Sequence, residues 1–341
     1  MNIGIVGIGF MGTTHFNAAK ALRGARVFAI SSRDPAKLSG DWSHISGNLG
    51  RQGGVQDLTG IRTYTDYRDL LADPDVDLVD ICLPVELHRP VAIEALQAGK
   101  HVLVEKPIAP TLADADAMIQ AAEEAGKRLF VAHVLRFFPE FAFVKQALES
   151  GEYGRLVAAH FKRVISKPKW AMDGAEPPSP FAADVVLDLH IHDADFVQFL
   201  LGMPDRVFAR GVPAGGGLLY VHAQYLYDRL GISISCQSGA LSMEAVPFEH
   251  GFDAYFEKAT LSFNSRSAEG LSMWRLNQQE IVQPTLSSVD PFTAELQYVV
   301  DALQGKNDGS LLDARSARNS LFLCELCKES ARRGEPVAVR Q

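Results

Sequence analysis

Three glycines near the start of the chain have the spacing of a phosphate-binding turn. Residues 7–12 read GIGFMG, directly after an apolar run at residues 3–6 and directly before a helical pattern. In that context the first glycine permits a tight turn, the second lets a pyrophosphate come close to the backbone, and the third lets the helix and the strand pack closely. The free amides of the helix N-terminus attract phosphates. We favour a dinucleotide site over a plain glycine turn, with contacts from Gly7, Gly9, Phe10, Met11 and Gly12.

The end of the second predicted strand bears on the choice between NAD and NADP. About 20 residues beyond the glycine motif, an acidic residue normally accepts the ribose 2′-hydroxyl. This chain has Ser32 and Arg33 there instead. A serine leaves room for a 2′-phosphate and an arginine provides its charge partner, so we favour NADP as the cofactor. In the alternative, Arg33 lies at the start of a helix and stacks on the adenine, and the cofactor is NAD.

Three further motifs, at residues 83–88, 105–107 and 135–137, stand where predicted strands end. The carboxyl ends of parallel strands are where open sheets bind ligands. Lys106 is the most informative residue, since a lysine beside a nicotinamide can hydrogen-bond a substrate oxygen and stabilise developing negative charge. The alternative is an exposed lysine in a turn before proline. We expect cofactor contacts from Leu83, Pro84, Lys106 and Arg136.

A carboxylate and an imidazole lie four residues apart, at Asp188 and His192. On a helix they face the same way, so the carboxylate can hold and tune an imidazole that titrates near neutral pH, as a general base should. His190 projects differently and either packs or contacts substrate. A metal site at His190 and His192 is disfavoured because the two side chains diverge on a helix. We therefore expect a base and its orienting carboxylate, and no metal.

The surrounding elements predict two domains, because single cores stop growing near ~250–300 residues. Through the first third, apolar runs alternate with helical patterns, which predicts a doubly wound parallel sheet of the Rossmann type in an α/β domain at residues 1–130. Residues 131–341 read as an α+β domain with a large, mostly antiparallel sheet, whose last helices can pack back toward the first domain. The expected first-domain strands are residues 3–6, 26–30, 61–63, 78–83, 101–104 and 128–132.

One connection in the first domain is unusually long. Residues 38–60 are rich in glycine and polar residues and exceed the ~2–6 residues usual between such elements. We interpret this insertion either as a mobile loop near the cofactor or as a disordered segment.

Taken in order, the motifs resemble the glucose-fructose oxidoreductase and inositol dehydrogenase family (Gfo/Idh/MocA) over nearly the whole chain. The matching features are the glycine motif with His15, residues 64–67, residues 98–107, Asp188 with His192, and the closing residues 334–337.

The resemblance implies an NAD(P)-dependent dehydrogenase or reductase that moves hydride between a nicotinamide and a hydroxyl-bearing carbon of a sugar, polyol or derivative. It implies that Lys106, Asp188 and His192 form the catalytic group: His192 accepts the hydroxyl proton, Lys106 stabilises the alkoxide and Asp188 orients the site. It also implies that Glu105 lies near the nicotinamide ribose and that His88 lies close to the cofactor.

Related chains place the segment at residues 163–170 over the substrate. Its cations can meet an anionic or polyhydroxylated ligand, and the alternative is a solvated loop. The expected substrate contacts are Lys106, Arg163, Trp170, Asp188 and His192.

The composition argues against several classes of partner. The formal net charge is −8 and the lysines and arginines form no dense block, so no nucleic-acid partner is expected. No run approaches the ~20 apolar residues of a membrane helix and no cationic leader precedes the first strand, so we expect a cytoplasmic protein. Four cysteines are too few to staple the chain, and Cys324 and Cys327 are expected in a helix core.

Apolar alternation at residues 218–221 and 232–235 indicates that the second sheet buries a face against another subunit. We therefore expect a homodimer or homotetramer. Two other functions stay open: a catalytically silent or redox-neutral nucleotide-binding regulator of the same family, and a metal-dependent hydrolase that uses His190 and His192. Lys106, Asp188 and His192 favour an enzyme, because a sensor needs no base with an orienting carboxylate.

Overall fold

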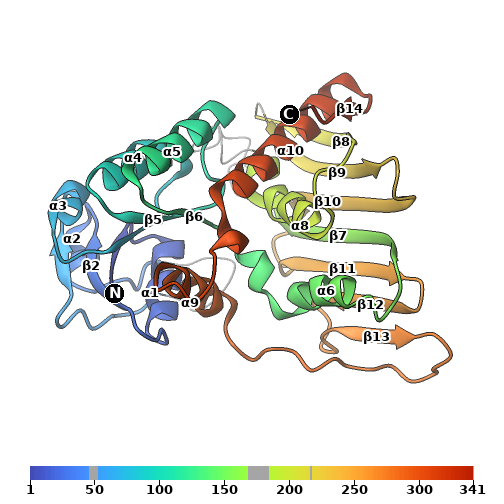
Figure 1. Cartoon of the computed structure of the whole chain (residues 1–341), viewed down its shortest axis with the longest axis horizontal. Helices are drawn as coiled ribbons and strands as arrows, with labels where there is room; N and C mark the ends of the chain where they lie inside the picture. The colour runs from blue at the N-terminus through green and yellow to red at the C-terminus, as the bar shows by residue number, and fades with distance from the viewer. Residues whose placement is uncertain (46–52, 168–183, 216, 341) are drawn as a thin grey trace. The chain divides into compact units, whose positions relative to one another are not determined.

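The computed structural model describes residues 1–45, 53–167, 184–215 and 217–340 (Figure 1). The chain folds into two compact units, each formed from two separate stretches of sequence. The first comprises Met1–Phe137 and Val289–Arg318, and the second comprises Phe138–Ser288 and Asn319–Gln341. The first unit therefore continues past residue 130, where we expected the boundary, and also takes in a helix from near the end of the chain.

The first unit holds a six-stranded, wholly parallel sheet, which confirms the predicted Rossmann architecture. Its order, β3-β2-β1-β4-β5-β6, reverses direction between β1 and β4, and ligands of such sheets bind in the crevice at that switch point. The strands are β1 (Asn2–Val6), β2 (Arg26–Ser31), β3 (Arg62–Tyr64), β4 (Leu78–Ile81), β5 (His101–Glu105) and β6 (Leu129–Ala132).

Helices cover both faces of this sheet, with α4 and α5 on one side and α1 and α9 on the other (Figure 1). Their ends follow local chemistry: Thr111 caps α5 by accepting the N–H of Asp114, and Gly126 ends it in the left-handed conformation. The helices are α1 (Phe10–Ala19), α2 (Pro35–Leu38), α3 (Tyr67–Ala72), α4 (His88–Gln97), α5 (Leu112–Ala125) and α9 (Pro291–Leu303).

The long connection at residues 38–60 is packed in its described parts. Trp42 is fully buried, its ring lies 4.7 Å from that of Phe16, and its indole N–H donates to the Lys37 carbonyl. Asp41 and Val55 form an antiparallel bridge. In residues 38–45 and 53–60 an apolar side chain and a β-bridge hold the connection against the first unit, so these parts are not a disordered insertion. The interpretation as a mobile loop stays a prediction. Residues 46–52 lie outside the described residues.

The second unit holds an eight-stranded sheet of order β13-β12-β11-β7-β10-β9-β8-β14. Within the described strands of this second sheet, only the β7–β10 pairing is parallel, which confirms the expected, mostly antiparallel sheet. The strands are β7 (Leu156–Ser166), β8 (Arg206–Ala214), β9 (Gly217–Tyr227), β10 (Ile232–Ser242), β11 (Glu249–Phe256), β12 (Ala259–Asn264), β13 (Ser272–Arg275) and β14 (Val337–Ala338).

An aromatic cluster joins this sheet to its helices. The Phe141 ring of α6 (Pro139–Ser150) lies 5.1 Å from both Phe196 of α8 (Ile191–Leu201) and Phe252 of β11, edge to face in each case. One π-helical turn (Val186–His190) leads into α8. The last helix, α10 (Ala314–Arg333), begins in the first unit and continues in the second.

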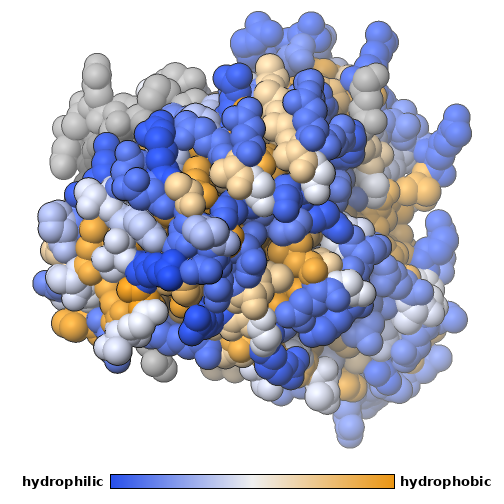
Figure 2. All heavy atoms as spheres, turned by 60° about the vertical axis from the view of Figure 1, so that its left-hand side comes forward, coloured by the Kyte–Doolittle hydropathy of each residue, from blue (hydrophilic) through white to orange (hydrophobic). Residues whose placement is uncertain are grey.

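Two expectations from composition can be checked against the described residues. All four cysteines are free, and Cys324 and Cys327 are buried, which confirms their core placement. None of the helices in the described ranges combines the length and the apolar character of a membrane span. The face shown in Figure 2 is mainly hydrophilic, with hydrophobic residues in separate groups.

Candidate functional site

The glycine turn between β1 and α1 fits a bound pyrophosphate. A Cβ on Gly7, which has φ +96°, would lie 2.7 Å from the Cys82 carbonyl oxygen, and a Cβ on Gly12 would lie 2.0 Å from the Gly7 oxygen. These two glycines are therefore required by the turn itself. Gly9 differs, because nothing lies within 4 Å of its Cβ position and no side chain caps the helix there. The open space and free amides at Gly9 suit a phosphate.

A pocket of about 960 Å³ opens beside this turn, at the carboxyl ends of the central strands. Of the predicted cofactor residues, it is lined by Gly7, Gly9, Ser32, Arg33, Leu83 and Pro84. Several other lining residues were not among the cofactor contacts predicted from the sequence. Some of them belong to motifs at residues 64–67 and 83–88, and others lie on α2, α3 and α4. They include Lys37, Thr65, Asp66, Tyr67, Arg68, Cys82, Leu87 and Glu94.

Both positive and negative groups surround the end of the pocket at Ser32. The Ser32 hydroxyl accepts the Asp34 N–H, and Asp34 in turn caps α2 at the Ala36 N–H, so the chain does enter a helix there. Arg33 and Lys37 both line the pocket beside these residues. The lining of the pocket therefore includes the cations Arg33 and Lys37 and the acidic residue Asp34 beside Ser32.

His88 connects the turns that follow β4 and β5. Its Nδ1 lies 2.9 Å from the Pro107 carbonyl oxygen and its Nε2 lies 2.9 Å from the Leu83 carbonyl oxygen. Burial lowers the pKa of His88, and the two carbonyl contacts oppose that shift. The side chain holds these turns from inside the unit, and it is not among the residues that line the pocket.

The Arg136 side chain is likewise buried and hydrogen-bonded inside the first unit. Its guanidinium donates to the Leu311 carbonyl and to the Ser316 hydroxyl, and the side chain is buried. Phe10, Met11, Gly12, Glu105 and Lys106 also lie outside the lining of the pocket, although the first three belong to the glycine turn and the start of α1.

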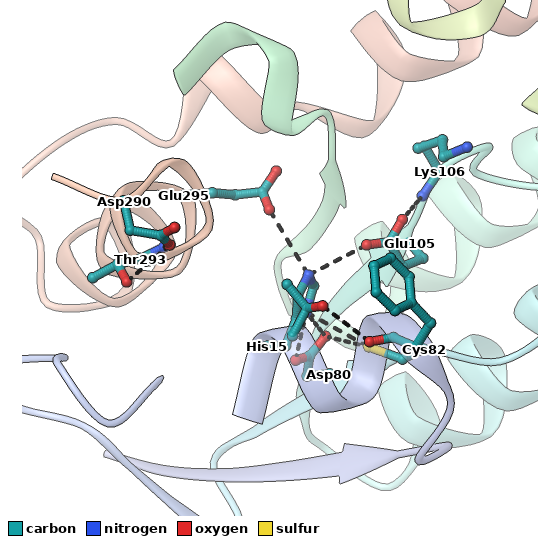
Figure 3. Close-up of polar contacts among 10 residues, drawn as sticks. His15, Asp80, Cys82, Glu105, Lys106, Asp290, Thr293 and Glu295 are labelled. Carbon is teal, nitrogen blue, oxygen red and sulfur yellow. Dashed lines mark hydrogen bonds and ion pairs between the residues drawn. The ribbon is translucent and has the colours of Figure 1, made fainter. Parts of the chain in front are cut away.

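A cluster of buried ionisable groups lies behind the glycine turn (Figure 3). His15 on α1 places Nδ1 2.9 Å from Asp80 Oδ2 and Nε2 3.3 Å from Glu105 Oε1. Glu295 of α9 lies 4.0 Å from the same Nε2. Burial alone would lower the pKa of His15, but the negative charge of Asp80 outweighs it and raises the pKa well above its usual value. His15 is therefore an imidazolium at neutral pH.

This cluster includes one group with the composition of a metal site. Among the described residues, the ligand atoms of His15, Asp80 and Cys82 all lie within 4.8 Å of one another. The donor set fits a metal poorly, since the 2.9 Å contact between His15 and Asp80 is a direct hydrogen bond. Burial also raises the pKa of Cys82, which keeps it a thiol, whereas metals bind the thiolate. The group is a hydrogen-bonded cluster.

Lys106 follows the last residue of β5. Its backbone N–H donates to Glu105 Oε2 at 3.0 Å, which ties the start of the turn to the buried carboxylate. The Lys106 side chain is half-buried, and the bond to Pro107 is cis.

The remaining predicted residues belong to the second unit. Asp188 is exposed on the π-helical turn, and His192 is half-buried in the first turn of α8. His190 is buried between the Ser238 hydroxyl and the Tyr225 hydroxyl, and burial lowers its pKa to about 3. His190 thus packs as a neutral imidazole, the first of the two roles considered for it.

Arg163 is buried on β7 and pairs with Asp193 of α8. This placement gives no support to Arg163 as a substrate contact, because its guanidinium is engaged inside the unit. Trp170, the other residue expected from that segment, lies outside the described residues.

Two family models match this chain. Residues 1–133 match the model described as an oxidoreductase family with an NAD-binding Rossmann fold, and residues 141–248 match the GFO/IDH/MocA C-terminal domain. A 1,5-anhydro-D-fructose reductase from Ensifer adhaerens is 30% identical over 249 residues, which make up 67% of this chain and 72% of that protein. The chain belongs to the GFO/IDH/MocA oxidoreductase family.

Other members of the GFO/IDH/MocA family are also similar. A myo-inositol 2-dehydrogenase from Thermotoga maritima is 32% identical over 62% of this chain, and the match spans only 58% of that relative. An Agrobacterium radiobacter oxidoreductase, solved with NAD+, L-tartaric acid and magnesium, is 25% identical with a TM-score of 0.80 and coverage of 99% and 98%. A levoglucosan dehydrogenase, solved with NADH and levoglucosan, shares the fold at 21% identity, a TM-score of 0.81 and full coverage of both chains.

Proposed function

We propose that this protein is an NAD(P)-dependent oxidoreductase that interconverts a hydroxyl and a carbonyl group on a sugar, polyol or derivative. The observation that carries the proposal is the open space at Gly9, where free helix amides face a pocket at the switch point of the parallel sheet. The named activities of the relatives, on myo-inositol and 1,5-anhydro-D-fructose, support the substrate class.

The proposed chemistry assigns a role to each reacting side chain. When bound, the nicotinamide supplies the acceptor or donor of the hydride. In the oxidative direction, a ring nitrogen of His192 takes the hydroxyl proton while the carbon loses its hydrogen as hydride, which leaves a carbonyl. Lys106 Nζ hydrogen-bonds the substrate oxygen as negative charge develops on it, and Asp188 orients the imidazole. These assignments follow from residue chemistry and family resemblance.

We further propose that NADP is the preferred cofactor. Ser32, Arg33 and Lys37 support this preference, because they give the pocket a small side chain and two cations at the end where we expect the ribose. Parallel fluorescence titrations with NADPH and NADH test it, after release of any nucleotide carried over from expression. Tighter binding of NADPH is the expected result, and tighter binding of NADH would reverse the preference. Binding of neither would overturn the oxidoreductase proposal.

The substrate class is tested with a panel taken from the relatives. Purified protein is assayed with myo-inositol, levoglucosan and 1,5-anhydro-D-fructose, by the absorbance of the reduced nicotinamide in both directions. Turnover of at least one polyol or sugar is expected. Cofactor binding without turnover on a broad sugar and polyol panel would instead favour a redox-neutral or regulatory member of the family.

We also propose that the second unit forms a homodimer or homotetramer through its sheet. Val212, Tyr255 and Trp274 are 44%, 45% and 39% exposed on its strands, which supports a covered face in the assembly. Light scattering coupled to size exclusion measures the mass directly, and a monomer at micromolar concentration would contradict this proposal.

A further inference from the structure

Buried charges connect the helix of the glycine turn to the residue before Lys106 (Figure 3). His15 is fully buried on α1, and its two ring nitrogens face Asp80 of β4 and Glu105 at the end of β5. The other oxygen of Glu105 accepts the backbone N–H of Lys106 at 3.0 Å. His15 therefore bridges two carboxylates on neighbouring strands, and the second of them ends the strand from which Lys106 follows.

The bridge determines the ionisation of Glu105. Burial would raise the pKa of this carboxyl, but the ion pair with His15, 3.3 Å from Nε2 to Oε1, outweighs burial and lowers it. Glu105 is thus an ionised carboxylate, which only accepts hydrogen bonds. Glu295 behaves in the opposite way: burial raises its pKa, and neither of its carboxyl oxygens has a hydrogen-bond partner among the described residues. The cluster therefore holds one cation between two carboxylates, beside a neutral carboxylic acid.

Such a network is costly to bury, and the packing of the sheet does not need it. Asp80 lies in a strand whose other members, Leu78, Val79 and Ile81, are apolar and fully buried. Desolvating charged groups destabilises the fold unless partners compensate, and apolar residues of similar volume often serve stability as well. This cost indicates a task beyond packing, and Glu105 is the member of the network that lies at the ligand-binding end of the sheet.

We propose that His15, held by Asp80, is a positioning residue that fixes the Glu105 carboxylate for the nicotinamide half of the bound cofactor. The inference rests on the proposed function, since it takes from it that a nicotinamide dinucleotide binds to this unit. His15 acts through Glu105 and does not itself touch the cofactor.

Two substitutions separate the two ends of the imidazole. The side-chain amide of asparagine takes the place of Nδ1, so His15→Asn keeps a partner for Asp80 and removes the contact with Glu105. The side-chain amide of glutamine takes the place of Nε2, so His15→Gln keeps a partner for Glu105 and removes the contact with Asp80. Each variant is titrated with NADH, NADPH and ADP by fluorescence or calorimetry, and its thermal stability is measured alongside.

We expect the two variants to rank in opposite order for dinucleotide affinity and for thermal stability. His15→Asn should weaken the tighter-binding dinucleotide by about tenfold or more, as when a charged hydrogen-bonding group is misplaced, while His15→Gln retains most of the affinity. ADP lacks the nicotinamide ribose, so its affinity should stay within about twofold in both variants. Thermal stability should show the opposite order, because His15→Gln leaves the buried Asp80 without its partner.

ADP also tests the purely structural alternative. If His15 only holds α1 in place, NADH and ADP will weaken in parallel, since both use the amides at the start of that helix, and the proposal is overturned. An unchanged dinucleotide affinity in His15→Asn overturns it as well. Lys100→Met is the matched control, because Lys100 is buried just before β5 and its Nζ donates to the Asp73 and Val76 carbonyls. It should lower stability without changing affinity for any of the three ligands.

A second arm applies if His15→Asn fails to fold. Glu105→Gln removes the carboxylate charge and keeps its shape, and should weaken the dinucleotide but not ADP. Equal loss for both ligands would count against the proposal. If the wild-type protein binds neither dinucleotide, the proposed function fails; if it binds and the variants match it, only the role of His15 fails.

Discussion

Arg163 and Asp193 form an ion pair in the interior of the second unit, with 3.1 Å between Nη2 and Oδ1. The Ser238 hydroxyl donates to the other carboxylate oxygen of Asp193 and also contacts His190. β7, β10 and α8 are thereby joined by polar groups at the centre of an otherwise apolar layer. Burial raises the pKa of Asp193, and the Arg163 charge and hydrogen bonds oppose that rise.

Removing the arginine should therefore be costly. Arg163→Met leaves a buried carboxyl without its countercharge, and we expect a loss of about 3–5 kcal/mol in the free energy of unfolding. Arg206→Met is the control, since its pair with Asp228 is exposed and screened by solvent, so its loss should change stability far less. Urea denaturation of both variants measures the difference, and equal losses would contradict the burial argument.

The glycine turn allows fold and ligand binding to be separated. Gly9→Ala should leave thermal stability nearly unchanged, because its Cβ meets nothing within 4 Å, yet it fills the space expected for the pyrophosphate. Gly12→Ala should lower both stability and binding, because its Cβ would meet the Gly7 oxygen at 2.0 Å. Thermal melts and NADPH and NADH titrations of the pair check this. Full dinucleotide affinity in Gly9→Ala would place the phosphates elsewhere.

Arg33→Ala tests the NADP preference without disturbing the core. Removing the guanidinium should weaken NADPH by about tenfold or more, the usual loss for one charged phosphate contact, and leave NADH within about twofold. Arg26→Ala is a matched control, since Arg26 begins β2, the strand that precedes Arg33, and does not line the pocket. A parallel loss for both cofactors would indicate that Arg33 stacks on the adenine, which both share.

Glu295→Gln should change the dependence of stability on pH. Burial raises the pKa of Glu295 well above its ordinary value of 4.5. A group with a raised folded pKa contributes stability at low pH and loses it as the pH rises toward that folded pKa. The glutamine variant has no such loss. Its free energy of unfolding relative to wild type should therefore grow between about pH 5 and pH 8, where glutamates in an unfolded chain are already ionised. Denaturation at several pH values measures it, and a constant difference would show that Glu295 is ionised.

Turnover tests the proposed reacting groups. Lys106→Met and His192→Asn should each lower kcat by about a hundredfold or more, the usual contribution of a positioned acid–base or charge-stabilising group. Dinucleotide affinity should persist in His192→Asn. His190→Asn is a poor substitute for it, because loss of the Ser238 and Tyr225 contacts would destabilise the unit. Unimpaired turnover in either proposed variant would remove that residue from the mechanism.

Local patterns predicted the elements well where a residue's own neighbours decide its structure. Helix α5 begins and ends at residues 112 and 125 because Thr111 caps it and Gly126 ends it, and both of these signals are visible in the sequence. The apolar runs that became β4, β5 and β6 were predictable because parallel strands inside such a sheet are buried on both faces.

The site was less predictable, because its members meet only after folding. Glu295 is far from His15 in the sequence, and no motif near residue 295 indicates an acid beside a glycine-turn helix. Trp42 similarly lies in a glycine-rich segment whose composition pointed away from the core. The burial of Arg163 depends on Asp193, which the segment around residue 163 does not reveal.

The helix α9 has a consequence for the order in which the molecule can form. Its side chains Leu296, Val299 and Val300 complete the core that contains Phe16 and Ile5 of the first unit. A ribosome makes these residues only after the whole sheet of the second unit, apart from its short last strand β14, has been synthesised. The nucleotide-binding unit is therefore among the last parts of the chain to finish, and a fragment that stops at residue 137 would leave this apolar surface uncovered.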